Sequence, residues 1–553
     1  MKLYRIATIV FFSSILCATA YGQGSVSGNL ETIFQYLNDD EAINANQPAE
    51  KALINSYMNI NYRNQGFKAG VRMESYLPRI LGYPDRFDGA GLGYRYFGYE
   101  NDLVDITVGN FYEQFGSGLL FRAYEDRALG FDNMMNGVKM NLRPYKGVIL
   151  KTVYGKQRFS FTEGRNTYAP ATVRGVDLEV NFNEWFPKLT EKKFRVTAAG
   201  SFVSKYEEDN NSQFILPENV GSYGGRLELA YKKFFINGEY VIKEQDPSQD
   251  NGFIYNYGQG LIFNAGYSKR GLGILLSGKS IDNMSYRSDR NAALQDAMIG
   301  FIPPLTKTHT YNLVATLYPY ATQPLGEVAF QADIIYKIKR GTKLGGKYGT
   351  DVALNYSTAY QPLQRTVGFN PEDNARVTYS TKLFDKTSLL YWRDLNVQIK
   401  RKINKEWTVK LNYFNIALNN DVVKLVNNTK GIIESHIGVL DVQYKINRKN
   451  TIRAELQGLW TVNNKDRGDW ATAVVEYTIS PDWFFSVIFQ SNYGNPNPED
   501  RINYPLIFVG KIWGSTRLQA GYGRQMEGLF CVGGVCRPVP ASNGLTVSFT
   551  HSF

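Results

Sequence analysis

Apolar and polar residues alternate with a period of two along almost the whole chain. Between residues 452 and 462, Ile452 and Leu456 alternate with Arg453 and Glu455. Similar segments occur at residues 176–183, 328–338 and 407–413. Strands with this pattern have one apolar and one polar face. The chain after residue 22 contains no amphipathic helical pattern and no apolar run of the roughly 18 residues that a membrane-spanning helix needs. We therefore expect an all-β fold.

Composition indicates which kind of all-β fold this is. Aromatic residues make up 14% of the chain, with 38 Tyr, and there are 51 Gly, yet mean hydropathy is −0.32. Outer-membrane barrels combine aromatic girdles at both membrane interfaces with one polar face on every strand. No Pro-rich, Ser-rich or highly charged stretch marks a domain boundary. The sequence predicts one transmembrane antiparallel β-barrel, with no separate plug or soluble domain.

Short polar turns alternate with longer loops, and outer-membrane barrels place their short turns in the periplasm. The longer loops are predicted at residues 38–50, 158–172, 207–219, 244–256, 281–307, 359–385, 418–433 and 525–543. Counting strands between them gives about 25. Since closed bacterial barrels have an even number, we estimate about 26 strands, with 24 as the alternative. Assigning each loop to one side of the membrane, working inwards from both ends of the chain, gives conflicting sides between about residues 280 and 385. One strand there is therefore miscounted. Several short turns are basic, for example Arg448-Lys449, and solvated turn charge is the simplest interpretation.

The N-terminal segment is predicted to be a signal peptide, residues 1–22, followed by the barrel at residues 23–553. Lys2 and Arg5 precede an apolar stretch, and small residues allow cleavage after Ala20 or Gly22. Cys17 does not follow the Gly or Ala that a lipid-attachment site requires. Losing Lys2 and Arg5 lowers the net charge from +11 to +9. Export argues against nucleic acid, so we expect outer-membrane lipid, lipopolysaccharide or anionic solutes as partners.

The last strand carries the most specific targeting signal. Leu545, Val547, Phe549 and the terminal Phe553 alternate with polar residues. An amphipathic final strand that ends in Phe resembles the signal by which the barrel-assembly machinery recognises its clients, and Phe549 and Phe553 are its expected contact residues. We expect both termini to be periplasmic and the protein to reside in the outer membrane.

Two cysteines remain after the signal, Cys531 and Cys536, in Cys-Val-Gly-Gly-Val-Cys. The Gly533-Gly534 pair suits a type I′ hairpin turn, which needs positive φ at both central residues. Cys531 would then lie opposite Cys536 at a spacing compatible with a disulfide. Free thiols are the alternative, and a metal site lacks two further ligands. In an exported chain we predict the disulfide.

The stretch from Gly109 to Asn133 breaks the alternation and mixes aromatic residues, glycines and both charges. One interpretation is a constriction loop that filters solutes; the other is a set of charges that pair across strands to stiffen a wide bore. Both place the segment inside the barrel. The predicted lumen network consists of Glu113, Arg122, Glu125, Asp126 and Arg127.

The run Gly-Asn-Phe-Tyr-Glu-Gln-Phe-Gly-Ser-Gly at residues 109–118, followed by Arg122 and Glu125, resembles an outer-membrane barrel family of Bacteroidota known only as a domain of unknown function. The resemblance extends over most of the mature chain. It implies the barrel fold and the outer membrane, and it implies no activity and no site residues.

Catalysis, cofactors and metals find little support. The three histidines are His309, His436 and His551, and Ser435-His436, in a predicted loop, is the candidate for a nucleophile–base pair. Glu207, Glu208 and Asp209 suit a calcium loop less well than a solvated one. We expect no enzyme, no cofactor and no metal site.

Two functions remain. The first is a channel or transporter for solutes. The second is a structural or accessory subunit of an outer-membrane protein-assembly or secretion complex, with other outer-membrane proteins or lipoproteins as partners. An open lumen with a ring of like charge favours the first function. A lumen filled by residues 110–135 and other loops, together with an exposed apolar patch on a loop or on the barrel wall, favours the second.

Overall fold

The wall of the molecule is one closed antiparallel sheet of 24 strands, seen in a computed structural model that describes residues 24–46, 48–367, 377–423, 430–532 and 535–553. Each strand pairs with its neighbours along the chain, and the last strand pairs with the first over Asn29↔Ser552 to Asn38↔Asn543. Closure leaves no free sheet edge, which a barrel needs in lipid.

The first half of the wall comprises β1 (Ser25–Asn38), β2 (Ala52–Asn64), β3 (Phe67–Tyr76), β4 (Gly89–Glu100), β5 (Val104–Phe111), β10 (Met135–Tyr145), β11 (Val148–Thr162), β12 (Arg165–Asn181), β13 (Phe194–Tyr206), β14 (Asn219–Tyr231), β15 (Phe234–Lys243) and β16 (Gly258–Lys269). The second half comprises β17 (Leu272–Asp282), β18 (Gly326–Ile338), β19 (Thr350–Pro362), β22 (Lys386–Lys402), β23 (Trp407–Asn419), β24 (Ile432–Lys445), β25 (Asn450–Thr461), β26 (Asp469–Ile479), β27 (Trp483–Gly494), β28 (Asn503–Trp513), β29 (Thr516–Gln525) and β32 (Ser542–Ser552).

Four small hairpins lie in the connections: β6 (Glu113–Gln114) with β7 (Arg122–Ala123), β8 (Glu125–Asp126) with β9 (Phe131–Asp132), β20 (Arg365–Thr366) with β21 (Tyr379–Ser380), and β30 (Gly528–Val532) with β31 (Val535–Val539). The helices in the described residues are short: α2 (Pro187–Glu191), α3 (Asn312–Thr316), α4 (Asn420–Val423), and the 3-10 turns Glu41–Ile43, Phe182–Glu184, Gln249–Asn251, Val462–Asn464 and Pro498–Asp500. None of them combines the length and apolar character needed to cross a bilayer.

The predicted alternation is the in–out alternation of the wall. In β25 the apolar side chains Leu456 and Trp460 point outward and are 56% and 50% exposed, whereas Glu455 and Gln457 point inward and are buried. An apolar outside around a polar inside is the reverse of a soluble barrel, and it identifies a wall that faces lipid.

Exposed aromatic side chains form two girdles on the outside, one near each end of the strands. One girdle contains Tyr62, Phe67, Tyr145, Tyr231, Phe234, Tyr336, Trp407, Trp483 and Trp513. The other contains Tyr36, Tyr206, Tyr223, Tyr240, Tyr356, Trp460, Tyr493 and Tyr522. Their spacing along the strands fits the two interfaces of a membrane.

The two ends of the barrel differ. At one end, here the turn rim, most strands are joined by short turns such as Gln65-Gly66 and Gly514-Ser515. At the other end, the loop rim, most connections are long. Because the number of strands is even, the start of β1 and the end of β32 both lie at the turn rim.

Three details of the predicted layout are wrong. The wall has 24 strands, the alternative value, rather than about 26. Residues 158–172 are not a loop, because β11 and β12 continue as a long hairpin that turns at Glu163-Gly164. The connection predicted at 281–307 runs from residue 283 to residue 325, which accounts for the conflict in loop sides between about residues 280 and 385.

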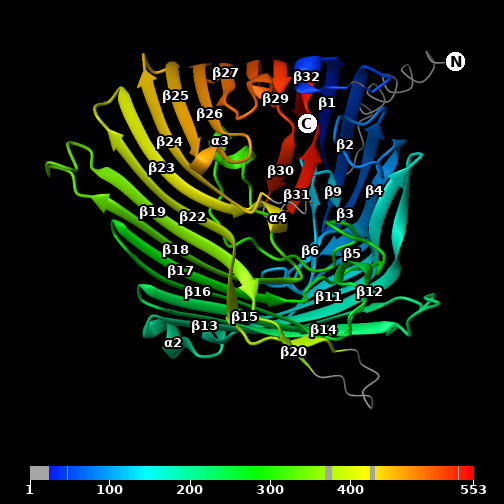
Figure 1. The fold of residues 1–553 in the computed structure, drawn as a ribbon. Coiled ribbons are helices and arrows are strands. Elements are labelled where there is room, and N and C mark those ends of the chain that lie inside the picture. Colours follow the sequence, from blue (N-terminus) through cyan, green and yellow to red (C-terminus); the bar gives the residue numbers. More distant parts are fainter. Residues whose placement is uncertain (1–23, 47, 368–376, 424–429, 533–534) are drawn as a thin grey trace.

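The interior is filled at the loop rim and open toward the turn rim. In β13 the inward-facing Val203 and Lys205 are fully buried, whereas Arg195 near the turn rim is exposed. In β14, Val220 is buried and Glu228 is exposed. In Figure 1, α3, β6, β30 and β31 lie within the ring of strands. The loops therefore cover the loop-rim half of the inner wall.

The barrel closes where the chain ends. The Phe553 N–H donates to the Gly28 carbonyl, the Gly28 N–H donates to the Phe553 carbonyl, and the Phe553 side chain is exposed on the outside. The predicted signal peptide, residues 1–22, lies outside the described residues.

Replacing Phe553 with Ser tests its role as an assembly signal. The backbone bonds to Gly28 can still form, so we expect folding competence in detergent but a reduced amount of heat-modifiable barrel in cell membranes. Phe485→Ser makes the same change on the outward wall, away from the terminus, and should assemble close to normally. Wild-type levels of Phe553→Ser would contradict the signal.

Candidate functional site: the filled lumen

Several connections fold into the lumen, and two of them bridge it: the first insert, residues 112–134, and the second insert, residues 283–325. The first insert joins β5 to β10 and contains the small hairpins β6–β7 and β8–β9. The second joins β17 to β18 and contains α3. Each begins and ends at the loop rim, so each reaches the lumen by folding back into the barrel.

The motif at residues 109–118 shapes the tip of the first insert. Gly116 has φ +52°, and a Cβ there would meet the Arg226 side chain at 2.4 Å, so the turn requires glycine. The neighbouring Ser117 N–H donates to the Glu239 carboxylate on β15 at 2.8 Å. The Phe115 N–H donates to the Phe121 carbonyl and closes the loop on itself. The small residues of the motif thus allow the tip to approach the wall.

The apolar side chains of this tip pack on small and β-branched wall residues. Phe115, Leu119 and Phe121 are buried against inward-facing valines, including Val153 and Val203. Gly175 leaves room beside them, because a Cβ there would lie 2.9 Å from the Phe115 ring. The first insert is therefore held by a hydrophobic core as well as by polar contacts.

A buried ion-pair network joins the first insert to β3 and β11. Arg72 lies 2.7 Å from Glu74 and 2.9 Å from both Glu125 and Asp132. Arg158 lies 2.6 Å from Glu74 and 2.7 Å from Asp132. The side chains of Arg72, Glu74 and Arg158 are at most 3% exposed. Multiple charge-assisted hydrogen bonds offset the desolvation of each group, and removal of one partner would leave a buried charge.

The network extends across the lumen. Arg127 pairs with Glu125 at 3.0 Å and with Glu31 on β1 at 2.6 Å, and its guanidinium lies 4.3 Å from the centre of the Tyr57 ring. The same insert contacts Glu239 on β15, and β1 and β15 lie on nearly opposite sides of the wall (Figure 1). The first insert therefore bridges the bore.

The five predicted lumen residues separate into three groups and one residue apart from them, Asp126. Glu125 and Arg127 belong to the buried network. Glu113 forms a second group with Lys139 and Lys151 at 3.4 and 3.0 Å.

Arg122 forms the third group together with two aromatic rings. Its guanidinium lies between the rings of Tyr124 and Phe301, 4.0 and 4.1 Å from their centres. Asp126 caps the adjacent turn by accepting the Leu129 N–H. Of the five predicted residues, only Glu125 and Arg127 are ion-paired with each other.

Burial and charge act in opposite directions on the two glutamates of the insert. Burial raises the pKa of Glu125, and the nearby Asp132 carboxylate adds to this rise beyond what Arg72 and Arg127 offset. Burial also acts to raise the pKa of Glu113, but Lys139 and Lys151 outweigh it and lower the pKa. Glu113 is therefore held as a carboxylate.

The network also contains Arg72, Glu74, Asp132, Arg158 and Glu31, which were not among the predicted site residues. In sequence, Arg72 and Glu74 are ordinary polar positions of an alternating strand. Their roles depend on a partner that enters from a loop more than 50 positions away, and no local pattern carries that information.

The second insert covers a further part of the inner wall at the loop rim. The Tyr286 hydroxyl donates to the Val220 carbonyl on β14, and α3 packs against β25 and β26 on the far side. Its apolar residues, including Leu313 and Tyr318, form a core with wall residues such as Trp470. The second insert therefore also crosses the lumen.

Polar wall residues receive the second insert. The His309 ring nitrogen lies 2.6 Å from the Asp394 carboxylate, and Lys307 donates to Asn396 at 3.1 Å. Near the end of the insert, the Tyr320 hydroxyl donates to Glu327, which also pairs with Lys279 at 2.7 Å. These contacts bind the insert to β17, β18 and β22.

The cysteine hairpin has the predicted register. Cys531 pairs opposite Cys536, and Val532 opposite Val535, while Gly533-Gly534 lies outside the described residues. The hairpin packs against α3. The disulfide itself remains a prediction.

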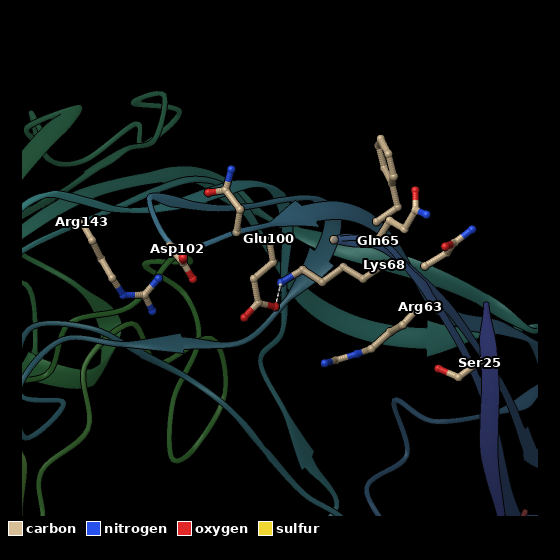
Figure 2. Close-up of a pocket in the computed structure, with 11 residues that line it drawn as sticks. Ser25, Arg63, Gln65, Lys68, Glu100, Asp102 and Arg143 are labelled. Atoms are coloured by element: carbon tan, nitrogen blue, oxygen red, sulfur yellow. Dashed lines mark hydrogen bonds and ion pairs between the residues drawn. The ribbon is translucent and has the colours of Figure 1, made fainter. Parts of the chain in front are cut away.

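A cavity of about 660 Å³ opens at the turn rim beside β1–β5 and β10. Figure 2 shows the Lys68–Glu100 pair between Arg63 on one side and Asp102 and Arg143 on the other. Lys68 also pairs with Asp105. The cavity is lined by both signs of charge, and it belongs to the open half of the molecule.

The Ser435-His436 pair falls on a strand, not in the predicted loop. Ser435 and His436 lie in β24, where Ser435 faces the lumen and His436 faces outward and contacts the Tyr413 hydroxyl. Successive strand residues point to opposite faces, so the two side chains do not form a nucleophile–base pair. No cluster of metal-ligating side chains occurs among the described residues.

A closed sheet with apolar outside, two aromatic girdles and an interior of polar residues defines an outer-membrane β-barrel. Within this class, the chain belongs to the family described as a family of unknown function, DUF6029, whose model matches residues 1–553. No curated protein matches the sequence.

Solved outer-membrane proteins resemble the structure distantly. The siderophore receptor PirA from Pseudomonas aeruginosa is 9% identical, with a TM-score of 0.41 over 97% of this chain and 81% of that one. The outer-membrane transporter YddB from Escherichia coli is 9% identical, with a TM-score of 0.40 over 95% and 81%. The outer-membrane protein opdK from Pseudomonas aeruginosa is 11% identical, with a TM-score of 0.31 over 73% and 97%.

Replacing Arg158 with Met tests the buried network. The change leaves Glu74 and Asp132 with one cation fewer, and we expect a loss of about 3–5 kcal/mol in the free energy of unfolding. Denaturant unfolding in lipid, followed by tryptophan fluorescence, measures it. Arg63→Met, at the exposed turn rim, is the control and should change stability little. Equal stabilities of the two variants would refute the role of the network.

Thiol labelling tests the disulfide. We expect Cys531 and Cys536 in protein taken from membranes to react with maleimide only after denaturation and reduction. Denaturation alone should leave both unlabelled, which separates a disulfide from simple burial. Labelling of denatured, unreduced protein would disprove the bond.

Proposed function

We propose that this protein is a barrel closed at rest that acts as a structural or accessory subunit of an outer-membrane protein-assembly or secretion complex. The observation that carries the proposal is the filled loop-rim half of the lumen. Two inserts with hydrophobic cores and buried ion pairs reach wall strands on opposite sides. A passive diffusion channel needs a continuous aqueous path, and these contacts oppose one.

The orientation belongs to the same proposal. Short turns face the periplasm in outer-membrane barrels, so the turn rim and both termini are assigned to the periplasm. The open half of the lumen then faces the periplasm and the inserts face the cell exterior. Outer-membrane lipid, lipopolysaccharide and the barrel-assembly machinery are its expected contacts, and other outer-membrane proteins or lipoproteins its expected partners. We assign it no enzymatic activity.

A gated solute transporter is the second candidate, and the open half of the lumen favours it. Inward-facing charges there remain accessible: Glu179 and Glu476 are 42% and 39% exposed, and Lys151 is 30% exposed. Such a vestibule can receive solutes. Transport would then require one insert to move, which means separating Arg127 from Glu31 or moving the Phe115 ring off the wall.

Single-channel recording in a planar bilayer separates the two functions from a passive pore. We expect folded wild-type protein to insert without steady conductance. A variant whose residues 115–131 are replaced by a short Gly-Ser linker should conduct, which shows that the silence of the wild type comes from the insert. Large steady conductance by the wild type would contradict the closed lumen.

A further inference from the structure

A groove of about 420 Å³ lies on the outward wall over β27, β28 and β29, beginning at the turn rim. Trp483 on β27 and Leu518 on β29 are the cross-strand neighbours of Lys511 on β28. One step deeper in the membrane band, Ala520 is the neighbour of Val509. The groove therefore runs along β28, from the girdle toward the middle of the wall.

The groove exists because a small side chain stands where its neighbours are large. On the outward face of β29, Ala520 lies between Leu518 and Tyr522, which are 38% and 56% exposed. The methyl group of Ala520 is too short to fill the space between the larger side chains around it, and it forms the bottom of the groove. Val509 and Leu518 make its sides apolar.

The end of the groove at the turn rim is cationic and aromatic. The Lys511 ammonium lies 4.9 Å from the centre of the Trp483 ring and 5.9 Å from that of Trp513. No carboxylate of a described residue lies within 4 Å of this ammonium. A lysine at the level of a tryptophan girdle reaches the headgroup zone of the membrane. Lys511 is thus available to an anion there.

Several other turns of the turn rim are also basic. Short turns contribute Lys232-Lys233, Lys269-Arg270 and Arg448-Lys449. Lys232 lies 4.8 Å from the centre of the Tyr231 ring, so it too reaches the girdle. Basic residues at a membrane surface attract anionic lipid headgroups by about 1 kcal/mol each. The sequence indicates only solvated turn charge for the basic turns. Their position beside the girdle places them at the level of the lipid headgroups.

We propose that this groove binds one phospholipid with an anionic headgroup. The phosphate contacts Lys511 between the two indole rings, and an acyl chain lies along Val509 and Ala520. With the turn rim in the periplasm, as proposed above, the leaflet at this level consists of phospholipid. The proposal is independent of whether the lumen conducts.

Native mass spectrometry of the full-length protein, delipidated and then supplied with phosphatidylglycerol or phosphatidylcholine, tests the site. We expect one phosphatidylglycerol to be retained in preference to phosphatidylcholine. Lys511→Gln should reduce the retained fraction about fivefold, the factor expected for one basic residue at a membrane surface. Lys232→Gln removes a lysine that also lies over an aromatic ring but does not line this groove, and retention should be unchanged.

Ala520→Phe fills the floor of the groove without changing charge and should also abolish retention. Heat-modifiability of each variant shows that the barrel is folded. Equal retention of the two lipids, equal losses for Lys511→Gln and Lys232→Gln, or full retention by Ala520→Phe would each overturn the proposal. A mass spectrum in which an acidic protein, rather than a lipid, is bound and is lost in the Lys511→Gln variant would overturn it as well.

Discussion

The hydrogen bonds between β1 and β32 are the contact on which the rest of the structure depends, because they turn an open sheet into a barrel. Once 24 strands close, every strand has a hydrogen-bonded neighbour on both sides and the outside can face lipid. The same closure creates a bore too wide for wall side chains to fill. The width of the barrel thus sets the problem that the inserts solve.

The inserts combine two kinds of attachment with different physical consequences. Phe115, Leu119 and Phe121 bury apolar surface on the wall, which is non-directional. The Arg72–Arg158 network requires defined partners, and a misplaced insert would leave buried charges unpaired. The hydrophobic contacts favour a filled lumen in general, and the ion pairs select one arrangement of it. Opening the barrel would have to break both.

The sequence predicts the wall better than the lumen. Alternation in residues 452–462 identifies the outward and inward side chains of β25, because facing alternates with every residue of a strand. The sequence predicts a loop at 158–172, where polar residues, Gly164 and Pro170 cluster. The structure instead forms a strand hairpin there. For the first insert, its place inside the barrel followed from composition, but Arg72, Glu74 and Arg158 did not. Their partners are set by how a loop folds back, which depends on the whole barrel.

Cysteine accessibility along one strand tests the filled lumen most directly. In a background with Cys531 and Cys536 replaced by Ser, single cysteines are placed at Val203 and at Arg195, both inward-facing on β13. Val203 lies under the first insert and Arg195 in the open half. With a hydrophilic maleimide applied to purified barrel in nanodiscs, we expect rapid labelling at position 195 and protection at position 203, because the first insert shields Val203 from solvent. Equal labelling rates at the two positions would contradict it.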